Sequence, residues 1–250
     1  MNYDLTLLEE GAKQLGIPLS QAQKEQFIRY YEYLVEKNKV MNLTAITEYE
    51  EVIVKHFLDS LSLVKVQDFS GKKEGKTMID VGTGAGFPGI PLKIAFPELK
   101  IVLLDSLNKR VGFLNEVIEM LNLQEIKAVH GRAEDFARQK EYRESFDFCV
   151  SRAVANLSTL SEYCLPFVKE GGCFVSYKSG KIEEELSQAG DAVKILGGKV
   201  RDMIKFSLMD QDMERSFVVI EKKKPTPKKY PRKAGLPSKE PLTAATRPGK

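Results

Sequence analysis

The sequence predicts an α/β protein: a doubly wound, seven-stranded, mainly parallel sheet with a small N-terminal helical subdomain and a basic C-terminal tail. From Thr77 onward, short β-prone apolar runs alternate with helix-length segments, as in a parallel sheet covered on both faces. A glycine-rich turn follows the first of these runs. The chain has 250 residues, of which 42% are hydrophobic and 29% charged, which is typical of a globular protein with one sizeable core.

Residues 1–70 are expected to form the helical subdomain. Ser20 and Gln23 have the spacing of a capping box, in which each side chain satisfies a backbone N–H at the start of a helix. Thr47 and Glu50 have the same spacing. Each pair precedes a run of apolar residues that recur on one helical face, so two main helical segments are predicted.

Residues 71–222 are expected to form the sheet domain, and the polar segment 71–76 marks its beginning. After the first strand, which starts at Thr77, the expected strands are Leu99 to Asp105, Ile126 to His130, Phe146 to Ser151, Cys173 to Tyr177, Lys199 to Phe206 and Arg215 to Glu221. The expected helices are Asn108 to Leu121, Ala133 to Arg138, Leu157 to Val168 and one that starts at Ile182. The last two strands are strongly β-prone and predict a hairpin-like end to the sheet.

The most informative segment is 77–91, TMIDVGTGAGFPGIP, which predicts a strand, an acid near its tip and a glycine-rich turn that opens into a helix. Without a Cβ, Gly82, Gly84 and Gly86 allow a tight turn and the close approach of a nucleotide-like ligand. Two ligand classes fit, a dinucleotide and S-adenosylmethionine. Asp80 favours the second, since a carboxylate repels a pyrophosphate but suits a sulfonium and an ammonium. A purely structural glycine turn is the third alternative.

Residues that follow the strands complete the expected site, because ligands of open α/β sheets bind beyond the carboxyl ends of the strands. Asp105 ends the second strand, roughly 20 residues beyond the glycine loop, where a carboxylate can accept hydrogen bonds from both ribose hydroxyls. The other candidates are Phe87 as a lid, Ser106 and Leu107 beside the adenine, Ala133 and Glu134 near its amino group, and Arg152 between donor and acceptor. The structural alternatives are core packing for Phe87, a helix cap for Asp105, a solvated helical turn for Glu134 and an ion pair for Arg152.

The net charge of +3 hides an asymmetry. Residues 221–250 hold ten Lys or Arg and two Glu, whereas the first 220 residues hold 28 basic and 33 acidic side chains. The tail, residues 223–250, is also rich in proline and is not expected to form a packed core by itself. Contact with nucleic-acid phosphates and a merely solvated extension are both open. Tyr230 and Arg232, an aromatic ring among cations, favour RNA.

Other classes are disfavoured. No apolar run approaches the roughly 20 residues of a membrane helix, and the N-terminus lacks a signal-peptide pattern, so a cytosolic protein without membrane contact is expected. The unrelated spacings of Cys149, Cys164 and Cys173 argue against a disulfide framework or a zinc site, and no metal is expected. His56 and Asp59 share a helical face, where a cap or an interdomain polar contact is expected rather than catalysis.

Taken together, these residues resemble the RsmG family, also called glucose-inhibited division protein B. The segments that carry the resemblance are Met41–Ile46, His56–Leu61, Asp80–Pro91, Leu104–Leu114, Arg132–Glu134, Ser151–Val154 and Tyr230–Pro237. The resemblance implies a Rossmann-like bacterial methyltransferase that uses S-adenosylmethionine to methylate N7 of a guanine in 16S rRNA, either free or in the small ribosomal subunit. It also implies donor contact by Gly82, Phe87, Asp105 to Leu107, Ala133, Glu134 and Arg152.

A guanine N7 target agrees with the residues. This nitrogen carries an in-plane lone pair and no proton, so the enzyme needs orientation and charge placement rather than a strong base. Arg152 and Lys178, at successive strand ends, are the expected catalytic contacts to a phosphate or to guanine O6. Two other functions stay open on sequence alone: a nucleotide-dependent oxidoreductase, which Asp80 disfavours, and a non-catalytic RNA-binding protein on the same scaffold. A monomer is expected.

Overall fold

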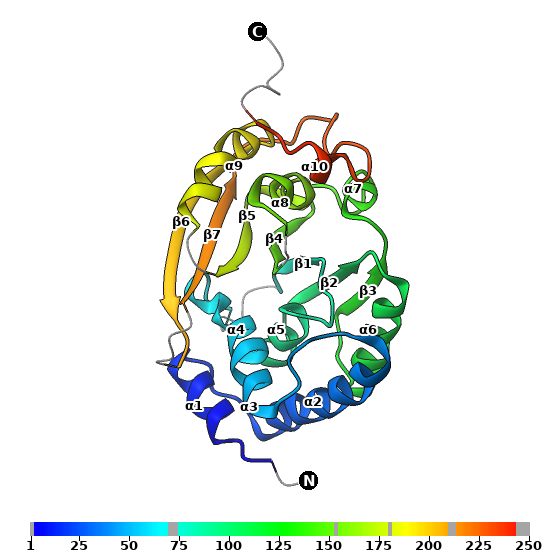
Figure 1. Cartoon of the computed structure of the whole chain (residues 1–250), viewed down its shortest axis with the longest axis vertical. Coiled ribbons are helices and arrows are strands. Elements are labelled where there is room, and N and C mark those ends of the chain that lie inside the picture. Colours follow the sequence, from blue (N-terminus) through cyan, green and yellow to red (C-terminus); the bar gives the residue numbers. More distant parts are fainter. Residues whose placement is uncertain (1–2, 70–74, 153–154, 180–181, 210–213, 244–250) are drawn as a thin grey trace.

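The structure, a computed structural model, describes residues 3–69, 75–152, 155–179, 182–209 and 214–243. Figure 1 shows a central sheet with helices on both sides, and the N-terminal helices lie at the end opposite to the C-terminal segment. Within these ranges, no helix is both long and apolar enough to cross a bilayer.

The elements alternate along the chain as the sequence predicts. The α-helices are α1 Thr6–Gln14, α2 Gln21–Met41, α3 Tyr49–Val52, α4 Asp59–Leu61, α5 Gly89–Ala95, α6 Asn108–Met120, α7 Ala133–Phe136, α8 Leu157–Cys164, α9 Glu183–Ile195 and α10 Leu236–Lys239. A π-helix, η1, spans Ile53–Leu58, and two 3₁₀ helices span Ser62–Lys65 (η2) and Leu165–Phe167 (η3). The strands are β1 Thr77–Val81, β2 Lys100–Asp105, β3 Ile126–His130, β4 Phe146–Ser151, β5 Val168–Ser179, β6 Gly198–Ser207 and β7 Glu214–Lys222.

The seven strands form one sheet in the order β3-β2-β1-β4-β5-β7-β6. Strands β1 to β5 pair in parallel, and β7 runs antiparallel to both β5 and β6. The predicted fold class is confirmed, including the hairpin-like end. Because the strand order reverses between β1 and β4, the carboxyl ends of these strands are the switch point at which such sheets bind ligands.

Alternate side chains of the strands face two hydrophobic cores. Met78 of β1 packs with the N-terminal helices, α5 and α6, whereas Ile79 faces the other side, with α7, α8 and α9. Phe27 of α2 and Phe57 of η1 are fully buried in the same cluster as Met78. The N-terminal helices therefore share a core with the sheet, and the division of the chain at residue 70 stays a prediction.

One of the two predicted capping boxes forms. Ser20 Oγ accepts a hydrogen bond from the Gln23 N–H at 3.3 Å, and the Gln23 side chain accepts one from the Ser20 N–H at 2.8 Å. The second predicted box is wrong: Glu48, not Thr47, is the N-cap residue of α3, and no side chain caps this end. The carbonyl of Thr47 instead accepts a hydrogen bond from the Tyr31 hydroxyl of α2 at 3.0 Å.

Strand β5 is longer than predicted. It begins at Val168, which pairs with Phe146, and the next pair joins Cys173 to Phe148. The extra residues between Val168 and Cys173 form a bulge, where Gly171 adopts a φ of +80°. Gly171 and Gly172, which directly precede the predicted strand, thus lie within β5.

Candidate functional site

The glycine-rich loop between β1 and α5 is held by Asp80. Its carboxylate is fully buried, and Oδ2 accepts hydrogen bonds from the Thr83 hydroxyl at 2.7 Å and from the Gly89 N–H at 2.9 Å. Oδ1 is buried without a hydrogen-bond partner among the described residues. Burial raises the pKa of Asp80 to about 6, against which the two hydrogen bonds act. At neutral pH Asp80 is therefore negatively charged, and its Oδ1 can still accept a hydrogen bond.

The same loop packs against the N-terminal helices. Gly86 has a φ of +99°, and a Cβ there would lie 2.9 Å from the Tyr30 hydroxyl, so glycine is required. The Tyr30 hydroxyl donates a hydrogen bond to the carbonyl of Ala85. The ring of Phe87 stacks on His56, with centroids 4.5 Å apart, and is only 5% exposed. In this structure Phe87 joins the loop to the core, as its structural alternative predicts.

Asp105, at the end of β2, connects the glycine loop to the next loop. Its Oδ2 accepts a hydrogen bond from the Gly84 N–H and its Oδ1 one from the Leu107 N–H, both at 2.9 Å. Arg110 Nη1 lies 3.6 Å from Oδ2. A carboxylate oxygen can accept more than one hydrogen bond, so Asp105 can order both loops and still receive a hydroxyl group.

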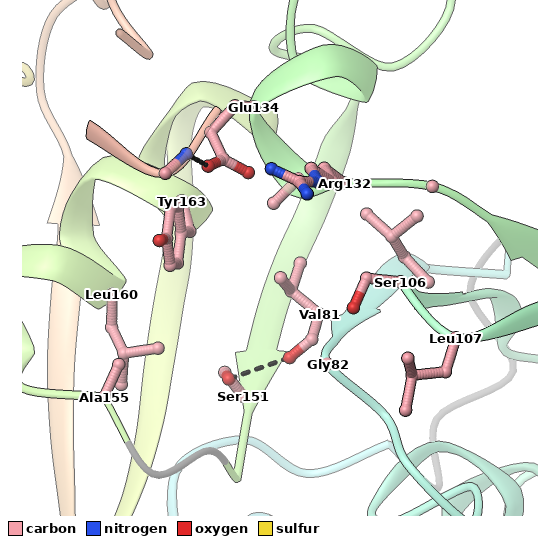
Figure 2. A pocket seen from close by; sticks show the side chains of 14 residues that line it. Val81, Gly82, Ser106, Leu107, Arg132, Glu134, Ser151, Ala155, Leu160 and Tyr163 are labelled. Atoms are coloured by element: carbon pink, nitrogen blue, oxygen red, sulfur yellow. Dashed lines mark hydrogen bonds between the residues drawn. The ribbon is translucent and has the colours of Figure 1, made fainter. Parts of the chain in front are cut away.

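A pocket of about 430 Å³ lies at the carboxyl ends of β1 to β4, at the switch point (Figure 2). The predicted residues that line it are Gly82, Ser106, Leu107, Ala133 and Glu134. The predicted residues outside its lining are Asp80, Gly84, Gly86, Phe87, Asp105, Arg152 and Lys178. The first group forms the pocket walls, whereas Asp80, Gly84 and Asp105 act by shaping the loops, through the hydrogen bonds described above.

The pocket also has a wall that the sequence motifs do not predict. Leu160 and Tyr163 of α8 line it, as does Ala155 (Figure 2). Gly235, a residue of the C-terminal tail, also lines it. The Gly235 N–H donates a hydrogen bond to Glu134 Oε1 at 2.8 Å. No local pattern in the sequence places these residues at the pocket, because they reach it only when α8 and the tail pack together.

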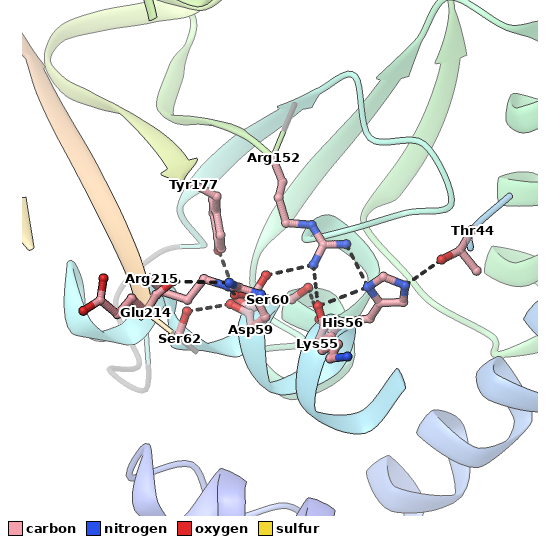
Figure 3. A network of polar contacts seen from close by, with 10 residues as sticks. All are labelled: Thr44, Lys55, His56, Asp59, Ser60, Ser62, Arg152, Tyr177, Glu214 and Arg215. Atoms are coloured by element: carbon pink, nitrogen blue, oxygen red, sulfur yellow. Dashed lines mark hydrogen bonds and ion pairs between the residues drawn. The ribbon is translucent and has the colours of Figure 1, made fainter. Parts of the chain in front are cut away.

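A polar network lies at the end of β4, facing the N-terminal helices (Figure 3). Arg152 donates hydrogen bonds to Asp59 Oδ2 at 2.9 Å and to the carbonyl of Lys55 at 3.1 Å. Its guanidinium carbon lies 5.0 Å from the centroid of the Phe87 ring. From β7, Arg215 Nε donates to Asp59 Oδ1 at 2.9 Å. The buried Asp59 carboxylate therefore binds two arginines, one directly after β4 and one in β7.

His56 completes this network. Its Nε2 lies 2.8 Å from the Thr44 hydroxyl, and its Nδ1 lies 3.3 Å from Arg152 Nη2 and 3.1 Å from the Lys55 carbonyl. Burial, and then the charge of Arg152, lowers the pKa of His56 to about 4, so the ring is neutral at neutral pH. Since a guanidinium can only donate, we assign Nδ1 as the acceptor and Nε2–H as the donor to Thr44. The Lys55 carbonyl would favour the other tautomer.

The polar contact expected for His56 and Asp59 is thus observed, and it reaches Arg152. Lys178 does not join it. Its ammonium group donates to the carbonyl of Ala155 at 3.0 Å and to Glu185 Oε1 at 2.6 Å, so it braces the pocket edge against α9. A direct contact of Lys178 with RNA stays a prediction.

The tail contradicts one expectation. Tyr230 is 3% exposed, and Arg232 forms an ion pair at 2.7 Å with the fully buried Glu162 of α8. Both side chains turn toward the protein, so the expectation that this pair contacts RNA is wrong. Tyr230 and Leu242 of the tail are buried in the hydrophobic core on the α8 side of the sheet, so the tail packs onto a core that the sheet domain supplies.

The chain was compared with known proteins. Residues 23–215 match the family model described as rRNA small subunit methyltransferase G, or GidB. The ribosomal RNA small subunit methyltransferase G of Lachnoclostridium phytofermentans is 58% identical over 233 residues, which are 93% of this chain and 95% of the relative. That of Alkaliphilus metalliredigens is 53% identical over 236 residues, which are 94% of this chain and 98% of the relative.

A solved structure supports the fold alone. A Galdieria sulphuraria protein assigned as a sarcosine dimethylglycine methyltransferase superposes with a TM-score of 0.51 at 12% identity, covering 66% of this chain and 85% of that chain. The family match and the two relatives span nearly the whole sheet and the glycine loop, and they agree with the family that the sequence motifs predict. This chain belongs to the rRNA small subunit methyltransferase G family.

Proposed function

We propose that this chain transfers a methyl group from S-adenosylmethionine to N7 of a guanine in 16S rRNA. Membership of a small-subunit rRNA methyltransferase family supports the reaction class and the kind of RNA. The structural observation that carries the proposal is the position of two neighbouring residues. Ser151 lines the pocket, whereas the next residue, Arg152, reaches the polar network on the side of the N-terminal helices. A donor in the pocket would thus meet an acceptor held beside Arg152.

The pocket fits S-adenosylmethionine. Its volume, about 430 Å³, is within the range of roughly 300–1,000 Å³ found for small-molecule sites. Leu107 and Ala133 would border the adenine, and Glu134 would accept a hydrogen bond from its amino group. Asp105 would bind the ribose hydroxyls. Asp80 lies behind the glycine loop, and its Oδ1 has no hydrogen-bond partner among the described residues. Its negative charge favours the sulfonium and ammonium groups of the donor next to this loop.

The reaction needs no base. S-adenosylmethionine supplies a methyl group on a positively charged sulfur. The N7 lone pair forms the new bond to carbon as the carbon–sulfur bond breaks, and the positive charge passes from sulfur to the base. The protein must therefore orient the guanine and balance charge. We assign Arg152 to a guanine O6 or phosphate contact, with Asp59 and the Lys55 carbonyl holding the guanidinium in place.

The exposed lysines of the tail are the proposed phosphate contacts. They are Lys223, Lys224, Lys228, Lys229, Lys233 and Lys239. We also propose that the chain acts as a monomer in the cytoplasm. Among the described residues, the large apolar side chains that stay exposed are scattered: Val40, Leu107 and Met203. Size-exclusion chromatography with light scattering tests the oligomeric state.

The proposed activity can be tested on small ribosomal subunits from cells that lack this protein. The subunits are incubated with the purified chain and S-adenosylmethionine, and the digested RNA is analysed for 7-methylguanosine by mass spectrometry. We expect 7-methylguanosine that depends on the chain and is lost with Arg152→Ala. If the donor binds but no new 7-methylguanosine forms, on subunits or on naked 16S rRNA, then guanine N7 is not the acceptor. Absence of donor binding as well would favour a scaffold that only binds RNA.

A further inference from the structure

The C-terminal tail runs back over the sheet domain beside α7 and α8, where Figure 1 shows it in orange and red. We call its described part, residues 223–243, the strap. The strap alternates buried anchors with exposed cations. Its buried residues are Thr226, Tyr230, Pro231, Pro237 and Leu242. Anchors spread along its whole length make the strap a packed part of the fold, with an inner and an outer face.

Arg232 and Glu162 fasten the strap to α8. Arg232 Nη2 and Nε donate to Glu162 Oε2 at 2.7 and 3.1 Å, and the Arg232 N–H donates to Oε1 at 2.7 Å. The Glu162 side chain is fully buried. A buried carboxylate without a partner is unfavourable. If the strap left this position, Glu162 would be either unpaired or exposed to water, so the ion pair holds the strap in place.

Other hydrogen bonds hold the strap on both sides of this ion pair. Arg143 donates to the carbonyl of Thr226 at 2.7 Å and to that of Tyr230 at 3.0 Å. Beyond Arg232, the Thr159 hydroxyl donates to the carbonyl of Pro237 at 3.0 Å. The backbone of the strap is therefore fixed from α8 and from the segment before β4.

The inner face of the strap reaches the donor pocket. Gly235 lines the pocket, and its N–H occupies Glu134 Oε1. Oε2 of Glu134 accepts no hydrogen bond from the described residues, so it is the oxygen that can meet a ligand. Gly235 thus orients the carboxylate, and Arg232 orients Gly235 from three residues away.

The outer face of the strap is cationic. Lys228, Lys229 and Lys233 are exposed, and they alternate with the anchors Tyr230 and Pro231. Phosphates bound by these lysines would hold the strap on both sides of Arg232. One continuous segment thus connects a surface suited to RNA with the carboxylate that faces the pocket.

We propose that the strap is a wall of the donor pocket, with Arg232 and Glu162 as positioning residues, and that RNA on its outer face strengthens donor binding. The proposal rests on the proposed function, since it takes the pocket to be the S-adenosylmethionine site. Linkage requires the effect to be reciprocal: a bound donor must strengthen RNA binding by the same factor.

The positioning role is tested by replacing the buried ion pair. Arg232→Leu with Glu162→Leu removes both charges together and leaves none unpaired. Isothermal titration with S-adenosylhomocysteine is expected to show a Kd at least tenfold higher than for the parent chain, with more rapid tryptic cleavage at Lys233. The matched control is the exposed pair Lys205 and Glu183, replaced by Met in both positions, for which donor affinity is expected to be unchanged.

Conservative single replacement gives a second measurement if the double variant fails to fold. Glu162→Gln keeps the volume and one acceptor oxygen for Arg232, so an intermediate rise in Kd is expected. An unchanged Kd in a variant whose strap is cleaved faster would overturn the positioning role. If the parent chain itself fails to bind S-adenosylhomocysteine, the proposed function fails instead, so the two failures are distinguishable.

The coupling is tested by titrating S-adenosylhomocysteine with and without saturating naked 16S rRNA. In the parent chain, RNA is expected to lower the donor Kd several-fold. Lys228→Ala with Lys229→Ala and Lys233→Ala is expected to keep the donor Kd measured without RNA and to lose the RNA effect. A donor Kd that RNA leaves unchanged in the parent chain, or lowers equally in the triple variant, would refute the coupling.

Discussion

Asp59 and Arg152 are 93 positions apart in the sequence and form an ion pair of 2.9 Å. The pair joins the N-terminal helices to the end of the strand that separates the donor pocket from the proposed acceptor side. Because Asp59 binds Arg215 as well, one buried carboxylate positions two cations. The N-terminal helices are therefore part of the site and not only a cover for the sheet.

Arg152→Ala is expected to reduce methyl transfer far more than stability. Removing one charged contact to a reacting group typically lowers turnover by roughly 100-fold or more. Asp59 would keep Arg215 as a partner, so the melting temperature should change little. Turnover is measured as 7-methylguanosine formed, beside thermal unfolding, with Arg29→Ala as the control, because the Arg29 side chain donates to the Met120 carbonyl at the end of α6. Near-normal turnover in Arg152→Ala would remove Arg152 from the mechanism.

Asp59→Asn is expected to affect both turnover and stability. The amide keeps one acceptor but removes the negative charge that Arg152 and Arg215 share, which we expect to destabilise the fold by about 2 kcal/mol. The fall in turnover should appear in kcat, since Asp59 does not line the donor pocket. Urea unfolding and methylation kinetics measure the two effects. Glu51→Gln, which removes an exposed ion pair with Lys55 in the adjoining helix, is the control. Equal kinetics in the two variants would contradict the positioning role of Asp59.

Asp80 predicts a pH-dependent difference in stability. Its pKa is raised from 3.8 to about 6, so the folded chain binds this proton more tightly than the unfolded chain does. The stability that this proton adds is complete below pH 3.8 and is lost as the pH rises through about 6. At roughly 1.4 kcal/mol per pKa unit, the loss is about 3 kcal/mol. Asp80→Asn cannot titrate, so its free energy of unfolding relative to the parent should increase by that amount between acid and neutral pH.

Chemical unfolding at a series of pH values measures this difference. His56, whose pKa is lowered to about 4, acts with the opposite sign, but it is present in both chains and cancels. The same Asp80→Asn variant should bind S-adenosylhomocysteine and, more markedly, the cationic S-adenosylmethionine less tightly. A stability difference that is flat with pH would mean that Asp80 titrates normally in the folded chain.

Asp105→Asn is expected to weaken donor binding about tenfold, a loss of about 1.4 kcal/mol. The amide can accept only one of the two backbone hydrogen bonds, and its NH₂ group would face the N–H of Gly84 or of Leu107. RNA affinity in the absence of donor should be unchanged. Asp135→Asn, an exposed acid in the first turn of α7, is the control for calorimetry. Unchanged affinity in Asp105→Asn would place the donor elsewhere.

RNA binding is expected to weaken steeply with salt, because each phosphate contact releases counterions. For single-stranded RNA the slope of log K against log salt is about −0.7 per contact, so losing three contacts should reduce its magnitude by about 2. Lys228→Ala, Lys229→Ala and Lys233→Ala together make this variant. The matched control replaces three exposed lysines outside the tail: Lys76 before β1, Lys100 at the start of β2 and Lys127 in β3. Equal slopes in both triple variants would mean that the tail lysines do not contact RNA phosphates.

The sequence by itself determined the features that depend on neighbouring residues. Strands β3 and β4 begin and end where the apolar runs predict, and Ser20 caps α2, because strand periodicity and capping chemistry are properties of short segments. The glycine loop followed by an acid at the end of β2 predicted the location of the pocket, since parallel strands bring their carboxyl ends to one edge.

Only the tertiary structure decided which side chains meet across that edge. Asp59 faces Arg152 and Arg215 because the N-terminal helices pack on one face of the sheet, and Gly235 faces Glu134 because the strap packs on the other. Basic residues look alike in sequence, yet Arg232 is paired with a buried carboxylate whereas Lys233 is exposed. The energy of such a pairing comes from burial and from a partner remote in the chain, and neither is encoded in local pattern.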